Sequence, residues 1–421
     1  MYPCRQFVHW FAVAQNLPLQ IFILAETVFP IIIIFGNTVS GSHMYPRILN
    51  LKKSSERRSL FLFGPRATGK STLLKTTFPE AKWFDLLDAQ TFGRLLRKPG
   101  LLAEETQAHE LIVIDEIQKL PALLDEVHRL IASRNQRFIL TGSSARKLKR
   151  GAANLLAGRA RLSHLFPLTS PEIPEFSLET YLNTGGLPLI YGDNEAALDL
   201  RAYVDLYLRE EVQAEALTRN AAGFGHLLDA LALSNGQEIN AQSLGSDVGL
   251  QARTVLNYIE ILEDTLLGFR VPAFRETKKR KATSHARFYF FDVGVTNALC
   301  GRGKLTPKTE LFGNALEHFI LLEARAYLSY FNKIDELTFW RTNTGFEVDM
   351  VLGKEVAIEV KGTDLISDKH LKGLRAFKEE NIVKRYLCVS LDSAPRKTED
   401  GIEILPVQLF LKKLWAGELL P

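Results

Sequence analysis

The chain has 421 residues, of which 46% are hydrophobic and 24% are charged, and a formal net charge of +4. This composition excludes a disordered or collagen-like chain and leaves room for two or three globular domains. The three cysteines, Cys4, Cys300 and Cys388, lie far apart without metal-ligand spacing, which argues against a disulfide framework or a zinc site. The mild positive charge permits nucleic-acid binding without indicating it, and a cytoplasmic location is expected.

Residues 1–43 form an apolar extension that has two interpretations. The run from residue 7 to 35 is long enough to cross a membrane, but Glu26 near its centre would cost about 3 kcal/mol on insertion. The segment Gly41-Ser-His-Met44 resembles a cloning remnant, and Met44-Tyr-Pro repeats Met1-Tyr-Pro. We therefore expect a non-native or misassigned extension before Met44 and no membrane association, with an anchor or targeting segment as the alternative.

Residues 60–72 read LFLFGPRATGKST, an apolar run followed by GxxxxGKS and a helix-compatible segment. Such a loop wraps backbone N–H groups around a phosphate, and the positive end of the following helix points at the same anion. Lys70 would contact the β and γ oxygens, and Ser71 would ligate Mg²⁺. The motif therefore predicts an ATP and Mg²⁺ site. Its predicted nucleotide-binding residues are Gly64, Pro65, Arg66, Ala67, Thr68, Gly69, Lys70, Ser71 and Thr72.

A second motif, Leu111-Ile-Val-Ile-Asp115-Glu116, is an apolar run that ends in two carboxylates. This pattern is typical of a buried parallel strand that delivers acids to its carboxyl edge. Asp115 would hold Mg²⁺ through water or Ser71, and Glu116 would act as general base toward the attacking water. The alternative, a strand followed by a solvated acidic turn, is disfavoured by the phosphate loop upstream.

Two more strands are expected, at residues 82–85 and from residue 137 to Thr141, which together predict a RecA-like sheet with an inserted strand. Ser143 at the end of the second strand would sense the γ-phosphate or merely cap the next helix. Arg159 would stabilise the transferred phosphate, in cis or across the subunit interface of a homo-oligomer, unless it is an ordinary surface arginine.

The segments GPRATGKST, LIVIDEIQKLP, LTGSSA and LAGRARLSHLFPLTSPE resemble the prokaryotic AAA+-type ATPases that carry a C-terminal domain of unknown function. The resemblance extends from about Met44 almost to the end of the chain. It implies an α/β P-loop ATPase domain at residues 44–171, a helical lid and winged helix at 172–291, and an α/β domain similar to PD-(D/E)XK nucleases at 292–421.

The middle of the chain is predicted to be helical from Glu172 to about Asn220 and to cover the nucleotide site. Its expected core residues are Tyr181, Leu182, Tyr203, Leu206 and Tyr207.

A helix-turn-helix outline follows at residues 241–266, where Val255, Ile259, Leu262 and Leu266 make an apolar stripe. Gln251, Arg253, Thr254 and Asn257 lie on its polar face and are types that read bases. Residues 268–274 and 288–291 would pair as a wing hairpin. Its tip, Lys278-Lys-Arg-Lys281, would contact DNA phosphates. The alternatives are a solvated loop or a winged helix used only for packing.

Four residues near the C-terminus resemble a complete PD-(D/E)XK site: Glu317 on a helix, then Asp349 on a strand, then Glu359 and Lys361 on the next strand. Strand alternation puts Glu359 and Lys361 on one face. Asp349 and Glu359 would share a Mg²⁺ ion, and Lys361 would orient or activate the attacking water. Glu317 would complete the metal shell or anchor the lysine. The alternatives are a hairpin with solvated charges and a nuclease-like fold that does not cut.

The sequence thus predicts an ATP- and Mg²⁺-dependent switch whose nucleotide state controls cleavage of nucleic acid, DNA in particular, at a C-terminal site. The rival prediction is a nucleotide-gated interaction protein whose last domain binds DNA or a protein partner without cutting it.

Overall fold

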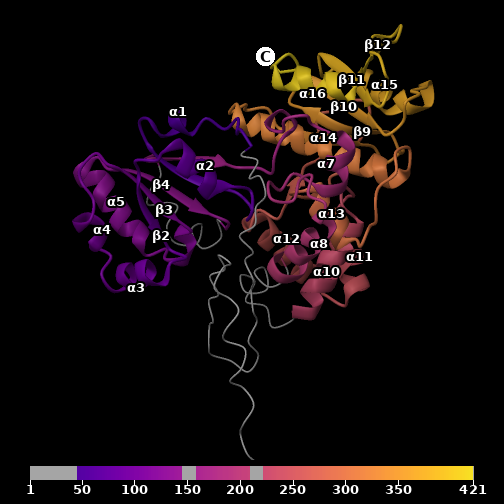
Figure 1. Ribbon diagram of the computed structural model, residues 1–421. Helices are drawn as coiled ribbons and strands as arrows, with labels where there is room; N and C mark the ends of the chain where they lie inside the picture. Colours follow the sequence, from indigo (N-terminus) through magenta and orange to yellow (C-terminus); the bar gives the residue numbers. More distant parts are fainter. Residues whose placement is uncertain (1–44, 145–157, 209–220, 421) are drawn as a thin grey trace, which may run out of the picture. The chain divides into compact units, whose positions relative to one another are not determined.

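The computed structural model describes residues 45–144, 158–208 and 221–420 (Figure 1). The chain divides into two compact units, Met1–Tyr45 and Pro46–Pro421. Almost all of the first unit, including the predicted extension at residues 1–43, lies outside the described residues. The description below therefore concerns the second unit.

The first domain is built on a five-stranded parallel sheet in the order β2-β3-β4-β1-β5. The predicted parallel α/β sheet is confirmed, and β4 is inserted between the strand before the phosphate loop and the acidic strand. The strands are β1 (Ser59–Phe63), β2 (Lys82–Asp85), β3 (Leu111–Asp115), β4 (Arg137–Gly142) and β5 (Ala160–His164).

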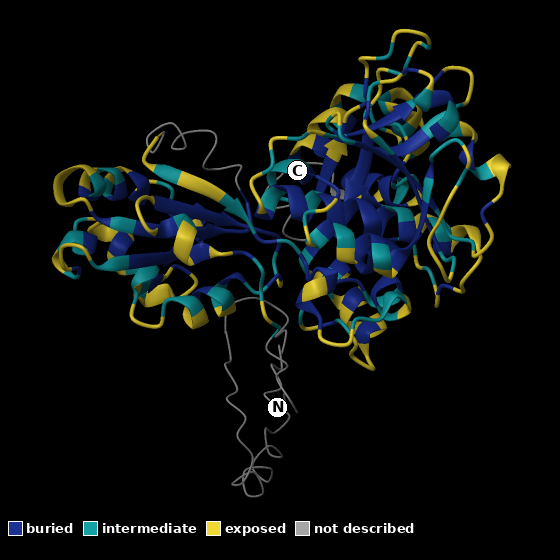
Figure 2. Ribbon diagram, turned by 90° about the horizontal axis from the view of Figure 1, so that it is seen from above, coloured by how far each residue is buried: buried dark blue, intermediate teal, exposed yellow. Residues whose placement is uncertain are grey.

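Helices cover both faces of this sheet, because its central strands are apolar on both sides (Figure 2). Alternate residues of β1 enter separate cores: Phe61 and Phe63 pack on the side of α3, α4 and α5, whereas Leu60 and Leu62 pack on the side of α1 and α2. The helical elements are α1 (Leu51–Ser55), α2 (Lys70–Thr77), α3 (Ala89–Arg97), α4 (Leu101–Glu104), the 3₁₀ turn η1 (Ile117–Lys119) and α5 (Leu123–Arg134).

The next segment is helical in pieces rather than continuously. It contains the 3₁₀ turn η2 (Ser170–Glu172), α7 (Leu178–Thr184), α8 (Ala196–Ala202), the π-helical turn η3 (Tyr203–Leu208) and α10 (Ala221–Leu233). Tyr181 and Leu182 are buried as predicted, but the prediction that Leu206 is a core residue is wrong, since 67% of it is exposed. The π turn widens the helix at this point, so the residue spacing of an α-helix does not apply.

The two predicted helices of the helix-turn-helix outline are α11 (Ala241–Val248) and α12 (Ala252–Asp264), and the hairpin is β6 (Gly268–Val271) paired antiparallel with β7 (Arg287–Phe290). Val255, Ile259 and Leu262 are buried, whereas Leu266 lies beyond the end of α12 and is only half-buried. The polar residues proposed to read bases, Gln251, Arg253, Thr254 and Asn257, lie at or near the start of α12, where all but the half-buried Thr254 are exposed.

The loop between β6 and β7 does not project as a free wing tip. Phe274 N donates a hydrogen bond to Phe339 O at 2.6 Å and Thr283 N donates to Arg341 O at 2.8 Å, so the loop runs along strand β8 (Leu337–Arg341). The amides of Lys278 and Lys279 donate to Glu380 at 2.9 and 2.8 Å. Arg280 forms an ion pair with Glu379 at 2.7 Å, while Lys278, Lys279 and Lys281 remain exposed.

The last domain contains a six-stranded mixed sheet in the order β12-β13-β11-β10-β9-β8. Its strands are β8 (Leu337–Arg341), β9 (Glu347–Leu352), β10 (Val356–Lys361), β11 (Arg385–Ser390), β12 (Arg396–Lys397) and β13 (Glu403–Pro406). Helix α13 (Val293–Leu299) belongs to the core of the middle helices, where Val295 and Leu299 pack with α8, α10 and α12. The helical elements that accompany the sheet are α14 (Glu310–Tyr330), η4 (Asp368–Leu371), α15 (Lys372–Lys378) and α16 (Val407–Trp415). Within the described ranges, no helix combines the length and apolar character needed to cross a membrane.

Candidate active sites

The phosphate loop joins β1 to α2 at the carboxyl edge of the parallel sheet. Gly69 precedes α2 with φ +86°, a left-handed conformation that glycine adopts without strain. The Lys70 Nζ atom donates to the carbonyl oxygens of Gly64 and Pro65 at 2.8 and 3.0 Å. The lysine is 6% exposed, so its charge is already held at the centre of the loop. The predicted loop residues therefore form one compact turn with its lysine directed inward.

Asp115 lies at the end of β3 between two hydroxyl groups. Ser71 Oγ donates to Asp115 Oδ2 at 2.6 Å, and the Thr141 hydroxyl donates to Asp115 Oδ1. The predicted Mg²⁺ ligands Ser71 and Asp115 are thus brought together. A hydroxyl oxygen beside a carboxylate fits Mg²⁺, which prefers oxygen ligands.

Glu116 follows directly and is buried beside two polar side chains. Its backbone has φ +57°, a left-handed conformation that is uncommon and strained for a residue with a side chain. The Gln118 amide donates to the Glu116 carboxylate and, at 3.2 Å, to Ser143 Oγ. Ser143 Oγ lies 3.5 Å from Glu116 Oε2. The predicted base and the predicted phosphate sensor therefore share one polar cluster.

The structure does not bring Arg159 to the phosphate loop of the same chain. It precedes Ala160, which pairs with Ser59 at the start of β1, whereas the loop follows Phe63 at the other end of that strand. Arg159 is exposed and contacts the ring of His128. A role in cis is therefore not supported by its position, and a role across a subunit interface stays a prediction.

The π turn η3 contacts the phosphate loop. The Tyr203 hydroxyl donates to Arg66 O at 3.3 Å, and the Arg66 guanidinium lies over the Tyr207 ring at 4.8 Å. The segment predicted to cover the nucleotide site thus touches the loop itself.

In the last domain, Lys361 at the end of β10 joins the two predicted acids. Its Nζ atom lies 2.5 Å from Glu359 Oε1 and 4.0 Å from Asp349 Oδ2. Asp349 Oδ2 also accepts from Val360 N at 2.7 Å, while Glu359 Oε2 is buried without a hydrogen-bond partner among the described residues. Asp349, Glu359 and Lys361, three of the four predicted residues, therefore lie together, and Glu359 Oε2 accepts no hydrogen bond among the described residues.

Glu317 on α14 lies near Asp349 and Glu359, but its carboxylate forms hydrogen bonds with two residues of strand β7. Glu317 Oε1 accepts from the Tyr289 hydroxyl at 3.0 Å and from Arg287 at 3.4 Å. Helix α14 comes this close because Gly362 after β10 faces Gly313: a Cβ at position 362 would lie 2.9 Å from the Gly313 Cα. Among the described residues, no three His, Cys, Asp or Glu side chains are arranged to hold a metal ion. The predicted third carboxylate is therefore near the pair without joining it.

Burial dominates the electrostatics of this second site. It raises the pKa of Glu359 well above its usual range and that of Glu317 to about 8, and the neighbouring Asp349 charge adds to both shifts. Burial alone would lower the pKa of Lys361, but Asp349 and Glu359 raise it above its usual value. The site therefore holds an ammonium group among acids whose charged forms burial disfavours.

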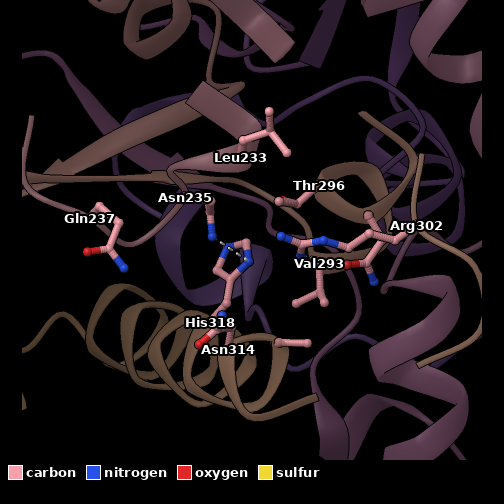
Figure 3. Close-up of a pocket in the computed structure, with 10 residues that line it drawn as sticks. Leu233, Asn235, Gln237, Val293, Thr296, Arg302, Asn314 and His318 are labelled. Atoms are coloured by element: carbon pink, nitrogen blue, oxygen red, sulfur yellow. Dashed lines mark hydrogen bonds between the residues drawn. The ribbon is translucent and has the colours of Figure 1, made fainter. Parts of the chain in front are cut away.

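A small pocket adjoins α10, α13 and α14 (Figure 3), and two of its lining residues, Asn314 and His318, are the chain neighbours of Gly313 and Glu317. His318 at its base donates from Nε2 to Phe290 O at 2.7 Å and faces Asn235 Nδ2 at 3.4 Å. Burial lowers the pKa of His318 to about 4, so it is neutral at pH 7. Because Arg302 is also bonded to Asn297, at 3.3 Å, the polar lining is largely paired within the protein.

Several residues of these sites were not predicted. Thr141 and Gln118 each lie two residues from a predicted site residue, so a search for polar side chains beside the carboxyl ends of β3 and β4 would have found them. Arg287 and Tyr289 gave no such signal, because the β7 strand reaches the acids only through the tertiary fold.

Comparison with known proteins divides the chain into three matched regions. Residues 56–174 match the family model described as an AAA domain, residues 175–306 match the domain of unknown function DUF8612, and residues 312–410 match the domain of unknown function DUF4143. The region that contains the phosphate loop and the acidic strand therefore matches an AAA domain, in agreement with the resemblance of its motifs.

Two bacterial proteins are similar in sequence to most of this chain. The uncharacterized protein Rv2008c of Mycobacterium tuberculosis is 27% identical over 320 residues, which cover 72% of this chain and 70% of the relative. An uncharacterized protein of Haemophilus influenzae is 23% identical over 352 residues, covering 78% and 82%. Among solved structures, the ORC2 protein of Aeropyrum pernix is 15% identical and aligns with 63% of this chain and 89% of its own, at a TM-score of 0.34. A superposition of this quality does not establish a common fold.

Proposed function

We propose that this protein hydrolyses ATP with Mg²⁺ at the phosphate loop and that its nucleotide state controls a second, metal-dependent site that cleaves nucleic acid. The observation that carries the first part is the hydrogen bond of 2.6 Å between Ser71 and Asp115, beside a phosphate loop whose lysine points inward. Both features belong to a region that matches an AAA domain.

In the hydrolytic step, Lys70 exchanges its two loop carbonyls for phosphate oxygens and so stabilises the charge that develops on them. Glu116, whose carboxylate contacts Gln118 and Ser143, accepts a proton from the attacking water. Gln118 and Ser143 orient Glu116. Mg²⁺, held by Ser71 and Asp115, would supply charge neutralisation for the triphosphate.

The test of this step uses Glu116→Gln with Asp125→Asn as control, since Asp125 is an exposed acid on the helix after the site. Glu116→Gln is expected to bind Mg²⁺ and ATP with near wild-type affinity and to lose about 100-fold or more in turnover, whereas Asp125→Asn should match the wild type. Undiminished turnover in Glu116→Gln would show that another group is the base.

The second part of the proposal is supported by the convergence of Asp349, Glu359 and Lys361. Asp349 and Glu359, whose Oε2 atom has no partner among the described residues, fit a divalent cation bound to oxygen ligands. Lys361 would orient the water that attacks a phosphodiester, and the metal would stabilise charge on the scissile phosphate. The exposed lysines of the β6–β7 loop would contact the nucleic-acid backbone.

Cleavage is tested with plasmid and single-stranded DNA in the presence of Mg²⁺. Wild type and Lys354→Ala should cut equally, because Lys354 is an exposed residue in the turn between β9 and β10, and Lys361→Ala should lose the activity. Equal background from all three proteins would remove the cleavage claim and leave the rival, a nucleotide-gated protein that binds without cutting.

A further inference from the structure

We infer that helix α14 transmits the nucleotide state of the phosphate loop to the site formed by Asp349, Glu359 and Lys361, called the carboxylate site below. Arg47 and Tyr330 connect the phosphate loop to the end of this helix. This inference rests on the proposed function, because it assigns the residues that couple the two sites.

Arg47 contacts the backbone of the phosphate loop directly. Its guanidinium donates to Thr68 O at 3.1 Å and to Phe166 O at 2.5 Å, and it forms an ion pair with Glu172 at 3.2 Å. The Arg47 side chain is only 7% exposed and the Glu172 side chain is fully buried. A buried arginine with this many partners has little freedom, so a change in the loop at Thr68 must displace it or break one of these bonds.

Tyr330, the last residue of α14, is bonded to the same guanidinium. Its hydroxyl accepts from Arg47 at 3.3 Å and from Phe166 N at 3.2 Å. The end of α14 is therefore separated from the Thr68 carbonyl by a single side chain.

Two further contacts make α14 follow this region as a rigid element. Glu323 accepts from Ser170 N and Ser170 Oγ, both at 2.7 Å, and from Trp415 Nε1 at 2.6 Å. The Arg325 guanidinium lies over the Phe166 ring at 5.0 Å and over the Phe269 ring at 3.8 Å. The helix is thus fixed to the segment that follows the parallel sheet at two points besides Tyr330.

The same helix places Glu317 beside the carboxylate site. Glu317 and Tyr330 lie on one uninterrupted helix of 21 residues and are separated by about 20 Å along its axis. Gly313 on this helix packs against Gly362, the residue after Lys361, so the helix lies directly beside strand β10. A small shift of the helix would therefore change the distance between Glu317 and the Asp349–Glu359 pair. In the present arrangement Glu317 is bonded to Arg287 and Tyr289 instead of joining the pair.

Nucleotide binding can favour one position of α14 over another. When Lys70 turns from the Gly64 and Pro65 carbonyls to a phosphate, the loop backbone is rearranged around the anion, and Thr68 lies within it. Whichever position of α14 is compatible with the filled loop becomes more populated. By reciprocity, occupancy of the carboxylate site must then change the affinity for nucleotide by the same factor.

The test is hydrogen exchange in the full chain, with and without Mg²⁺ and a non-hydrolysable ATP analogue whose binding is measured in the same samples. The readout is the exchange rate of residues 310–317, at the end of α14 far from Arg47. In the wild type, nucleotide should change this rate by about fivefold or more. Tyr330→Phe keeps the aromatic ring and should clearly weaken the response, although the Glu323 and Arg325 contacts remain. Arg47→Lys should also weaken it, because lysine cannot maintain the forked set of hydrogen bonds.

Tyr327→Phe is the matched control, because Tyr327 lies on the same helix and packs on Phe331 and Trp415. It should respond like the wild type. Nucleotide binding without any change at residues 310–317, or a wild-type response in Tyr330→Phe, would overturn the relay and leave the ATPase proposal intact. A wild type that binds no nucleotide would remove both.

Discussion

Replacing Glu172 by glutamine should destabilise the protein strongly, although the substitution changes one functional group and hardly any volume. Glu172 Oε1 accepts from Arg47 Nε at 3.2 Å and from Ile48 N at 2.8 Å, and Oε2 accepts from Thr169 N at 3.0 Å. Glutamine retains a single acceptor oxygen and turns an NH₂ group toward one of these donors. It also leaves the Arg47 guanidinium buried without its carboxylate.

Removing one partner of a buried ion pair costs about 3–5 kcal/mol, and we expect a value near the lower limit because the Arg47 guanidinium keeps its bonds to Thr68 O and Phe166 O. The assay is urea unfolding of wild type and Glu172→Gln, followed by fluorescence. Glu126→Gln is the control, because its partner Arg129 is largely exposed and water can solvate it. If Glu172→Gln loses no more stability than Glu126→Gln, the Arg47 cluster does not stabilise the fold as argued.

Two further predictions concern stability. Burial raises the pKa of Asp292 from 3.8 to about 6. Between these two pH values the folded chain therefore binds more protons than the unfolded chain. The free energy of unfolding should fall by about 3 kcal/mol as the pH rises through this window. Asp292→Asn cannot titrate, so the difference in unfolding free energy between wild type and this variant should change between pH 4 and 7; a constant difference would contradict the assignment. Phe377→Ala should cost about 3–5 kcal/mol, because the ring is fully buried against Trp340 and Phe274 at 5.0 and 5.5 Å. Phe331→Ala, at a site 47% exposed, should cost clearly less in the same urea titration, and equal losses would argue against the packing described for the last domain.

The local features of the first domain could be predicted because each is encoded in one short segment. The phosphate loop and the acidic strand carry their own signals, and the carboxyl ends of parallel strands must meet at one edge of the sheet. This is why Ser71 and Asp115 could be paired from the sequence. The same reasoning was not extended to Thr141, which lies near the carboxyl end of β4 and bonds to Asp115.

The features that depend on long-range packing could not be predicted. Arg47 lies before the phosphate loop in a segment without a motif, and its partner Tyr330 is 283 residues away. Arg287 reaches Glu317 only through the tertiary fold. The run of basic residues in the β6–β7 loop indicated a free wing tip, whereas the loop lies along β8. The spacing rules used for Leu206 failed because a π turn interrupts the helical period there.

The most direct test of the central claim is ATP binding and turnover in the presence of Mg²⁺ by wild type, Lys70→Ala and Lys75→Ala. Lys70 is buried in the loop, and Lys75 is an exposed lysine on the same helix. Wild type and Lys75→Ala should bind and hydrolyse ATP alike, and Lys70→Ala should do neither. A wild type that neither binds nor hydrolyses ATP, or a Lys70→Ala variant that does both normally, would contradict the account.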